Sequence, residues 1–320
     1  MHIQRLLILI LLPLFMFVMG CSSEASEPTL DGVGLLIEDT IDDQGWNSKG
    51  YQGLLNIHSS LDVHVDFREE VNSRYDVISA TNAFIDQDIN LIFGHGHIFA
   101  EYFSEISEDY PSIHFVSFNG EVNGDNVTNL EFDSYAMGFF AGMVGAASTQ
   151  SNHIAAIAAF PWQPELEGFK NGAIHMDPNV DVTIKYVEDW TDVEKALDYF
   201  DQLKQEGIDV YYPAGDGFHV EVIEQVKHEG LYAIGYVGDQ SDLGEATVLT
   251  STVQHVDQLY ELVAQQFKAG ALQPGNHTFD FSDGVISLGS FSPQVPTDLK
   301  EDIEEAIDAY IRNGTLPNEE

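Results

Sequence analysis

From residue 33 onward, apolar and polar positions follow two alternating patterns. Short apolar runs of strand length occur at 33–37, 63–67, 90–93, 112–117 and 127–132. Between them, apolar residues recur at helical spacing in 48–59, 75–86 and 99–109. This alternation of strand and helix predicts a parallel sheet with helices on both faces.

A second series of the same kind follows the first. It opens with an apolar helix at 134–148, whose small residues suit close packing against a sheet. Strands are predicted at 154–160, 182–187, 210–214 and 232–236, with helices at 165–176, 193–206 and 220–229. The C-terminal part adds a strand at 247–251, a helix at 254–268, strands around 279–288 and a helix at 299–313.

Two such series in tandem predict two similar α/β lobes rather than one large sheet. We expect residues 32–130 and 248–275 to form the first lobe, and residues 131–247 and 276–320 to form the second. A membrane-spanning helix is the alternative reading of 134–148, but that stretch is too short to cross a bilayer.

The N-terminus has the features of a secretory signal. Residues 1–5 carry a positive charge, 6–19 are apolar apart from Pro13, and Val18 to Cys21 resembles a bacterial lipobox, in which cleavage precedes a lipidated Cys. We therefore predict a signal peptide at 1–20 and a lipidated tether at 21–31. Anchoring through Cys21 would place the protein on the extracytoplasmic face of a bacterial cell membrane. An uncleaved N-terminal helix is the alternative, and it also leaves the protein at the membrane.

Charge and cysteine content exclude several classes of function. The chain of 320 residues has 53 acidic and 12 basic side chains, a formal net charge of −41. Such a surface repels phosphate backbones, so direct nucleic-acid binding is not expected. Cys21 is the only cysteine, which rules out an intramolecular disulfide. A hydrophobic content of 44% is sufficient for two cores.

The segment 41–47 contains the first candidate ligand-binding residues. It follows the first predicted strand, and loops at the carboxyl ends of parallel strands line the ligand crevice of open α/β sheets. Trp46 offers a flat face for stacking, Asn47 an amide that donates and accepts, and Asp43 a carboxylate. These side chains suit a ring-shaped polar ligand. The alternative is a helix N-terminus with a packed Trp.

Later loops repeat this arrangement. Trp190, Asp216 and Asp239 each follow a predicted strand, and Asp216 is flanked by two glycines. Packing for Trp190 and plain turns for the two Asp residues are the alternatives. His95 and His97 could hold a metal, but a metal site needs further ligands and none pairs with them in sequence, so we expect neither a metal nor a cofactor. The chain contains no recognised catalytic motif, so enzyme activity has no specific support.

Four segments carry a resemblance to a known family. They are 41–47 (IDDQGWN, similar to I-D-D-K-S-F-N), 132–142 (similar to F-x-x-x-x-x-G-x-L-A-G), 234–240 (IGYVGDQ, similar to I-G-V-D-x-D-Q) and 248–254 (VLTSTVQ, similar to V-L-T-S-x-x-K). The chain resembles the basic-membrane-protein (BMP) family of ligand-binding lipoproteins. Within that family it is most similar to the Med subfamily, on the segments 94–96, 162–165, 212–217 and 238–245.

The resemblance implies a type I periplasmic-binding-protein fold, in which two Rossmann-like lobes joined by three crossovers close on a small ligand. Receptors of this family bind purine nucleosides for an ABC importer. By analogy, Trp46 and Trp190 would sandwich the base and Asn47 would contact its edge. Asn119 stands where the family usually has Asp.

Two departures from the family pattern concern the sugar. Val237 and Gln254 replace a family Asp and Lys that serve the ribose. Losing a charged hydrogen-bond partner removes roughly 1.5–3 kcal/mol, so the ligand is expected to be altered, weakly bound or absent. Med proteins are described as positive regulators of a competence transcription factor gene. Since a lipid-anchored acidic protein cannot reach a promoter, any such effect here would be indirect, through a membrane partner.

Overall fold

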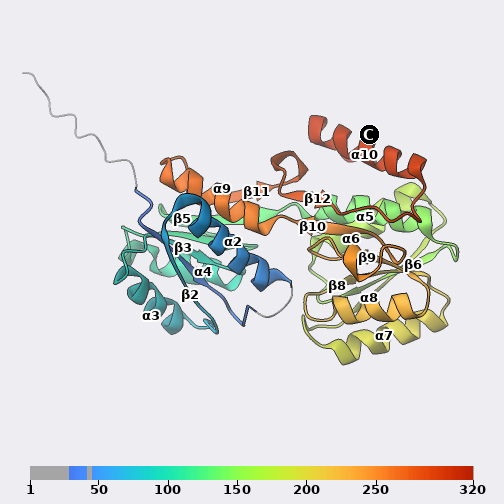
Figure 1. Cartoon of the computed structure of the whole chain (residues 1–320), viewed down its shortest axis with the longest axis horizontal. Coiled ribbons are helices and arrows are strands. Elements are labelled where there is room, and N and C mark those ends of the chain that lie inside the picture. Colours follow the sequence, from blue (N-terminus) through green and yellow to red (C-terminus); the bar gives the residue numbers. More distant parts are fainter. Residues whose placement is uncertain (1–28, 42–44, 320) are drawn as a thin grey trace, which may run out of the picture.

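The structure is a computed structural model that describes residues 29–41 and 45–319. It contains two lobes, each built on a six-stranded sheet flanked by helices (Figure 1). The sheet of the first lobe has the strand order β11-β5-β4-β3-β1-β2, and all its pairs are parallel. Its strands are β1 (Gly32–Leu36), β2 (His64–Arg68), β3 (Leu91–Gly94), β4 (His114–Phe118), β5 (Val127–Phe132) and β11 (Gly275–Phe279).

The sheet of the second lobe has the order β12-β10-β9-β8-β6-β7 and is parallel except for β12, which runs antiparallel to β10. Its strands are β6 (His153–Ala158), β7 (Asp181–Tyr186), β8 (Val210–Ala214), β9 (Tyr232–Gly235), β10 (Val248–Gln254) and β12 (Ile286–Leu288). The type of fold predicted from the sequence, α/β with two parallel-sheet lobes, is confirmed.

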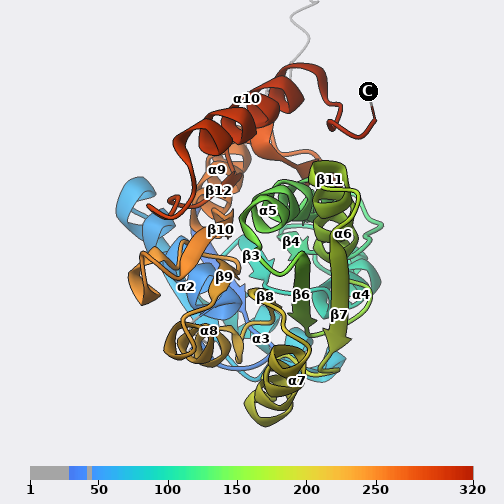
Figure 2. The same cartoon turned by 90° about the vertical axis from the view of Figure 1, so that its right-hand side faces the viewer.

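Helices lie between most consecutive strands, as predicted; within the described residues, β4 to β5, β9 to β10 and β11 to β12 are connected by a loop or a short 3₁₀ turn. The helices are α2 (Trp46–Leu61), α3 (Arg74–Ile85), α4 (Ile98–Ile106), α5 (Ser134–Ser148), α6 (Pro164–Met176), α7 (Val193–Gln205), α8 (His219–His228), α9 (Val256–Lys268) and α10 (Thr297–Asn313). Short 3₁₀ turns occur at η2 (Ser107–Asp109), η3 (Ser241–Leu243) and η4 (Phe281–Asp283). Figure 2 shows α10 on the opposite side of the second lobe from α7 and α8.

Burial explains why the strands read as continuous apolar runs. All residues of β1, β3 and β8 are buried, because helices cover both faces of each sheet. By contrast, β2 is only partly buried because it forms the outer edge of the first sheet. The sequence pattern of apolar runs therefore reports the inner strands most clearly.

The chain passes between the lobes three times, at Asp133, at His255 and between β11 and β12. The passages are held together by backbone hydrogen bonds, from Asp133 N to Phe279 O (2.8 Å) and from His255 N to Val285 O (2.8 Å). The sheets place β10, in the segment expected with the first lobe, in the second sheet, whereas β11 joins the first sheet. Helix α9, which follows β10, packs against α2 of the first lobe.

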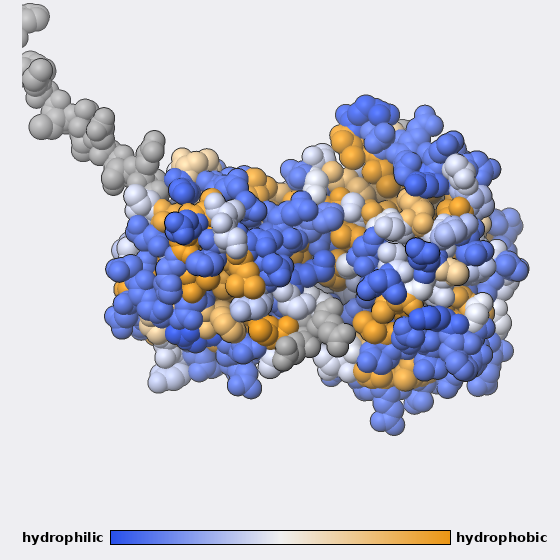
Figure 3. Space-filling model, viewed as in Figure 1, coloured by the Kyte–Doolittle hydropathy of each residue, from blue (hydrophilic) through white to orange (hydrophobic). Residues whose placement is uncertain are grey.

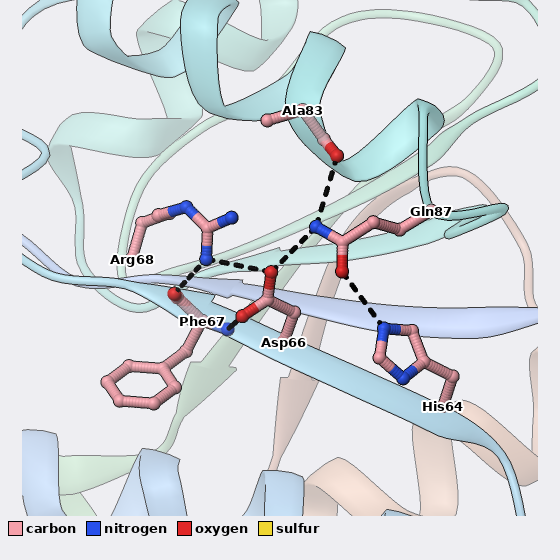
Figure 4. Close-up of polar contacts among 6 residues, drawn as sticks. All are labelled: His64, Asp66, Phe67, Arg68, Ala83 and Gln87. Carbon is pink, nitrogen blue, oxygen red and sulfur yellow. Dashed lines mark hydrogen bonds and ion pairs between the residues drawn. The ribbon is translucent and has the colours of Figure 1, made fainter.

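Polar side chains cover the exposed edge at β2 (Figure 4). The Asp66 carboxylate accepts hydrogen bonds from Gln87 Nε2 (2.8 Å) and forms an ion pair with Arg68 (2.8 Å). Gln87 Oε1 also lies 3.1 Å from the Nε2 of His64. Charged and polar groups on an edge strand discourage pairing with another chain, so this cluster protects the end of the sheet.

The outer surface is mainly hydrophilic, with scattered apolar patches, and its outline is indented between the lobes (Figure 3). This agrees with the large excess of acidic residues. Within the described part of the chain, the helices are all too short or too polar to span a bilayer. Residues 1–28, which include the predicted signal and Cys21, lie outside the described residues.

Candidate functional site

The carboxyl ends of the strands in the two sheets face each other, and loops from both lobes meet there. Gly45, which precedes α2 in the first lobe, lies against Asp216 of the second; a Cβ on Gly45 would be 2.5 Å from Asp216 Oδ1. The rings of His97 and Trp162 also meet across the lobes, with centroids 6.3 Å apart. These contacts define the interlobe site.

Trp46 begins α2 and lies half-buried in the first lobe. One face of its ring stacks on His95, with centroids 4.3 Å apart and planes at 13°. The edges of Phe118 and Phe132 contact it at 5.7 and 6.1 Å. The indole is therefore held in a fixed orientation by packed aromatic rings, which suits a stacking surface because little side-chain entropy remains to be lost on binding.

His95 follows β3 and holds the Trp46 indole in place through two contacts of its ring nitrogens. Its Nε2 lies 2.8 Å from the Trp46 carbonyl oxygen, and its Nδ1 lies 2.8 Å from the Tyr260 hydroxyl. The first contact needs a donor on the ring, and the second is satisfied when the ring accepts from Tyr260, which is the pattern of a neutral imidazole. Burial lowers the pKa of His95 to about 4, so the neutral form prevails at physiological pH.

Within the described residues, His95 and His97 are not joined by further side chains that could complete a metal site. Both ring nitrogens of His95 are engaged in the hydrogen bonds just described. Among residues 29–41 and 45–319, no three or more His, Cys, Asp or Glu side chains come together in a group that could hold an ion.

The two candidate asparagines occupy different settings. Asn47 donates from Nδ2 to the carbonyl oxygen of Thr40 (3.1 Å), which ties the start of α2 to the loop after β1. Asn119 follows β4, is exposed, and has a positive φ of 56°, a conformation that Asn adopts more readily than most residues. Asp43, the third candidate of the 41–47 segment, lies outside the described residues.

Trp190 belongs to a cluster of aromatic rings in the second lobe. It contacts Phe160 and Trp162 edge-on, at centroid distances of 5.4 and 5.8 Å, and Phe160 and Trp162 stack on each other at 5.5 Å. Trp162 is 59% exposed, unusually open for so large an apolar side chain. Site reasoning from the sequence overlooked Trp162, although its place directly after a predicted strand was the same signal that identified Trp190.

A buried polar network lies beneath this cluster. Gln163 Nε2 donates to Glu165 Oε1 (2.9 Å) and to the carbonyl oxygen of Ala214 (3.2 Å), and the Tyr236 hydroxyl donates to Glu165 Oε1 (3.3 Å). Burial raises the pKa of Glu165, while these hydrogen bonds oppose the rise. The network joins the loops after β6, β8 and β9, and so fixes their relative positions.

Lys49 is a second residue that the sequence did not single out. Its side chain leaves the first turn of α2 and its Nζ donates to the carbonyl oxygen of Gln254 (3.3 Å), at the end of β10. Burial lowers the pKa of Lys49, and the negative charges of Asp257 and Asp216 act in the opposite direction. No local sequence pattern distinguishes it from a surface lysine, because its role depends on the approach of the second lobe.

Asp239, in the loop after β9, lies beside the segment that follows β12. Its carboxylate accepts from the backbone N and the Oγ of Ser290 (2.9 and 2.7 Å) and from the backbone N of Ser241 (3.1 Å). These hydrogen bonds connect the loop after β9 to the segment after β12. Asp239 also borders a pocket between β12 and α10, whose lining includes Ile286 and Ile307.

The two departures from the family pattern have structural consequences of their own. Val237 is buried and has a φ of 62°, a left-handed conformation that is strained for a β-branched residue. The side chain of Gln254 contacts Ser134 Oγ (3.4 Å), and its carbonyl accepts from Lys49. The cation nearest to this part of the site therefore comes from α2.

Two α/β lobes, three passages between them and facing loops at the carboxyl edges define a type I periplasmic-binding protein. The family can now be stated as well. The chain belongs to the Bmp family, described as ABC transporter substrate-binding protein PnrA-like, which residues 31–320 match. The resemblance inferred from the four sequence segments is confirmed, and the family is one of substrate-binding proteins.

Individual relatives support the same assignment. The chain is 46% identical over 301 residues to the transcriptional activator protein med of Bacillus subtilis (strain 168), which covers 94% of this chain and 95% of that protein. It is similar to the crystal structure of a transcriptional activator of the comK gene from Bacillus halodurans, with 55% identity, a TM-score of 0.85 and coverage of 89% and 99% of the two chains. An ABC transporter solute-binding protein from Conexibacter woesei shares the fold at 17% identity, with a TM-score of 0.74 and coverage of 90% and 99%.

Proposed function

We propose that this protein is a lipid-anchored, extracytoplasmic binding protein that holds a small nucleoside-like ligand between its lobes, for an ABC importer or a signalling partner. The observation that carries the proposal is one aromatic group from each lobe near the loops that form the interlobe site. Trp46 begins α2 in the first lobe and stacks on His95, and Trp190 in the second lobe packs edge-on against Phe160. Two such faces suit a flat ring, and aromatic contacts add about 0.5–1.5 kcal/mol beyond the burial of area.

Polar side chains predicted from the sequence would orient the ligand. Asn47 and Asn119 have amides that donate and accept, and Asp216 has a carboxylate that accepts; Asp43, outside the described residues, is proposed to act in the same way. The Asp239 carboxylate accepts from Ser290 and Ser241, so its part would be to hold the loop after β9 in position. Family membership supports a binding role, since the family is described as substrate-binding. Lipidation at Cys21 with a palmitate-type chain, after removal of a signal peptide, would hold the protein at the cell membrane beside a permease.

A regulatory role is the second candidate. Both the Bacillus subtilis relative and the Bacillus halodurans structure carry the name of a transcriptional activator, and both are far more similar to this chain than the solute-binding protein. On this alternative the protein positively affects competence gene expression, with altered or lost nucleoside binding. The net charge of −41 opposes direct contact with DNA, so the effect would pass through a membrane partner.

One pair of variants tests both candidates. Calorimetric titration of the full-length protein in detergent with purine nucleosides and their free bases should give dissociation constants near 1 μM, about 8 kcal/mol of binding free energy. Trp46→Ala should weaken binding at least about tenfold, since it removes a stacking face. Tyr75→Ala, which removes an aromatic ring that is 78% exposed on α3, is the control and should bind like the wild type.

Variants of the two tryptophans separate transport from regulation in cells. If the regulatory candidate is correct, deletion of the gene lowers competence gene expression, and Trp46→Ala and Trp190→Ala restore it as well as the wild type does. Failure of both variants to restore expression would instead tie regulation to the ligand. An absence of binding across the whole panel, with a folded wild-type protein, would refute the nucleoside-binding proposal.

A further inference from the structure

The ammonium group of Lys49 lies at the junction of the two lobes. Its helix, α2, belongs to the first lobe, yet its Nζ is 3.3 Å from the carbonyl oxygen of Gln254 and about as close to Gly238, where a Cβ would lie 3.6 Å from it. A Cβ at that distance would make only an ordinary contact, so the lysine lies beside the backbone at the ends of β9 and β10. The ammonium is thereby placed at the base of the interlobe site.

Within the described residues, Lys49 forms no ion pair that would occupy its remaining donors. An ammonium has three donors, and the contact with Gln254 uses one. Asp216 and Asp257 are near enough to influence its charge, but none of the ion pairs formed within the described residues includes Lys49. A half-buried cation with this environment is suited to an additional acceptor oxygen.

A carboxylate from the other lobe lies at the same end of α2. Asp216 approaches the helix at Gly45, one turn before Lys49, and the backbone N of Lys49 donates to the carbonyl oxygen of Gly45 (3.2 Å). The site therefore presents a donor from one lobe and an acceptor from the other. A hydroxyl group accepts one hydrogen bond and donates another, so it can bridge such a pair.

The charges nearby favour a neutral ligand over an anionic one. Two carboxylates, Asp216 and Asp257, act on a single ammonium, so this region carries a net negative charge within a chain whose formal charge is −41. A phosphate would gain from Lys49 but would be repelled by both carboxylates and by the field of the whole protein. A sugar hydroxyl gains both hydrogen bonds without that repulsion.

We propose that Lys49 determines ligand specificity at the interlobe site by donating to a hydroxyl group of a neutral, sugar-bearing ligand, which in turn donates to Asp216. The proposal rests on the proposed function, since it names the part of a nucleoside-like ligand that this chain recognises. It assigns the selecting cation to α2, where no local sequence pattern identifies one.

The test compares a nucleoside with its base and its 5′-phosphate. Inosine, hypoxanthine and inosine 5′-monophosphate are titrated calorimetrically into the full-length protein and into Lys49→Met, Lys49→Gln and Lys49→Arg. Lys49→Met and Lys49→Gln should weaken inosine binding about 10- to 100-fold, the loss of one charge-assisted hydrogen bond, and change hypoxanthine binding less than about threefold. Lys49→Arg should retain part of the preference for inosine, and the wild type should bind the monophosphate more weakly than inosine.

The ratio of inosine to hypoxanthine affinity separates specificity from structure. If Lys49 only held the lobes together, both ligands would lose affinity equally and the ratio would stay constant, which would overturn the proposal. Lys170→Met removes the same charge from an exposed position on α6 and should leave the ratio unchanged. Melting temperatures show which variants are folded, and Lys49→Gln or Lys49→Arg replaces Lys49→Met if that variant is not.

The remaining outcomes distinguish this proposal from the proposed function. Wild-type inosine affinity in Lys49→Met, or a wild type that binds hypoxanthine as tightly as inosine, would overturn the role of Lys49 and leave nucleoside binding intact. Tighter binding of the monophosphate than of inosine would overturn the neutral ligand class. A folded wild type that binds none of the three compounds would refute the proposed function and this proposal with it.

Discussion

His95 is a polar residue whose role becomes visible only in three dimensions. In the sequence it stands in a Gly-His-Gly-His loop that could hold a metal or, being rich in glycine, could let the backbone approach a ligand. In the structure its ring lies between the Trp46 indole and the Tyr260 hydroxyl and holds the proposed stacking face in place. Tyr260 is far away along the chain, so no local pattern could have predicted this contact.

The buried neutral state of His95 makes stability depend on pH. The pKa of His95 is about 4 in the folded protein and about 6.5 when the chain is unfolded. Below pH 6.5 the unfolded chain binds the proton that the folded protein excludes, so stability is lost as the pH falls from 6.5 to 4. Urea denaturation should therefore give a free energy of unfolding lowered by about 2 kcal/mol between pH 7 and pH 5 through this residue.

The variant His95→Gln isolates that contribution. Its free energy of unfolding should be lower at pH 7, because the stacking contact is lost, but should change less than that of the wild type between pH 7 and pH 5. His64→Gln, at an exposed position on β2, serves as the control and should keep the wild-type dependence. Equal pH dependence in His95→Gln and the wild type would show that His95 does not contribute. Burial also lowers the pKa of His114, to about 4, and the pKa of His255, so both contribute in the same direction to the dependence that remains.

At the scale of elements, the pairing of α5 with α6 adds to one expectation. Helix α5 packs against the second sheet as expected, at β10 among other strands, and its glycines Gly138 and Gly142 also meet the backbone of α6. A Cβ on Gly138 or Gly142 would lie 2.0 Å from the carbonyl oxygen of Glu165 or Phe169. The sequence correctly indicated a close approach, but it could not identify the partner, because a glycine-rich face fits a helix and a sheet equally well.

Glycines on α6 contribute equally to this contact and provide a matched test. In Gly172→Ala the new Cβ would lie 1.8 Å from the carbonyl oxygen of Phe139, so the two helices would have to separate. We expect a loss of about 3 kcal/mol or more in the free energy of unfolding, at the upper end of overpacking effects. Gly145→Ala, whose Cβ would make an ordinary 3.5 Å contact with Ile154, should be neutral or up to about 1 kcal/mol more stable. Urea denaturation that finds both variants alike would refute the close packing.

At the scale of the whole molecule, the alternation of strands and helices was sufficient to predict two α/β lobes, because hydrophobic period and length distinguish buried strands from helices. The assignment of the last strands was not predictable in the same way. The runs that became β10 and β11 look alike in either sheet, and only the three passages between the lobes place β10 in the second and β11 in the first. The contact of Lys49 with Gln254 depends on those passages, so Lys49 emerged only with the fold, whereas Trp162 carried the same sequence signal as Trp190.

The overall charge leads to the last prediction, which concerns salt. With 53 acidic and 12 basic side chains, repulsions far outnumber the attractive pairs that the chain can form. Salt shortens the Debye length from about 10 Å at 0.1 M to about 3 Å at 1 M, so it screens the repulsions more than it weakens the few contact ion pairs. The melting temperature should therefore rise as NaCl increases from 50 mM to 1 M.

The double variant Glu305→Gln/Asp308→Asn neutralises two exposed acids in the C-terminal half of α10. It should stabilise the protein by about 0.5 kcal/mol at 50 mM NaCl and by much less at 1 M, since it removes repulsion and an unfavourable helix-dipole contact. A gain that persists at 1 M would point to helix propensity instead, and a melting temperature that falls with salt would mean that attractive pairs dominate despite the net charge.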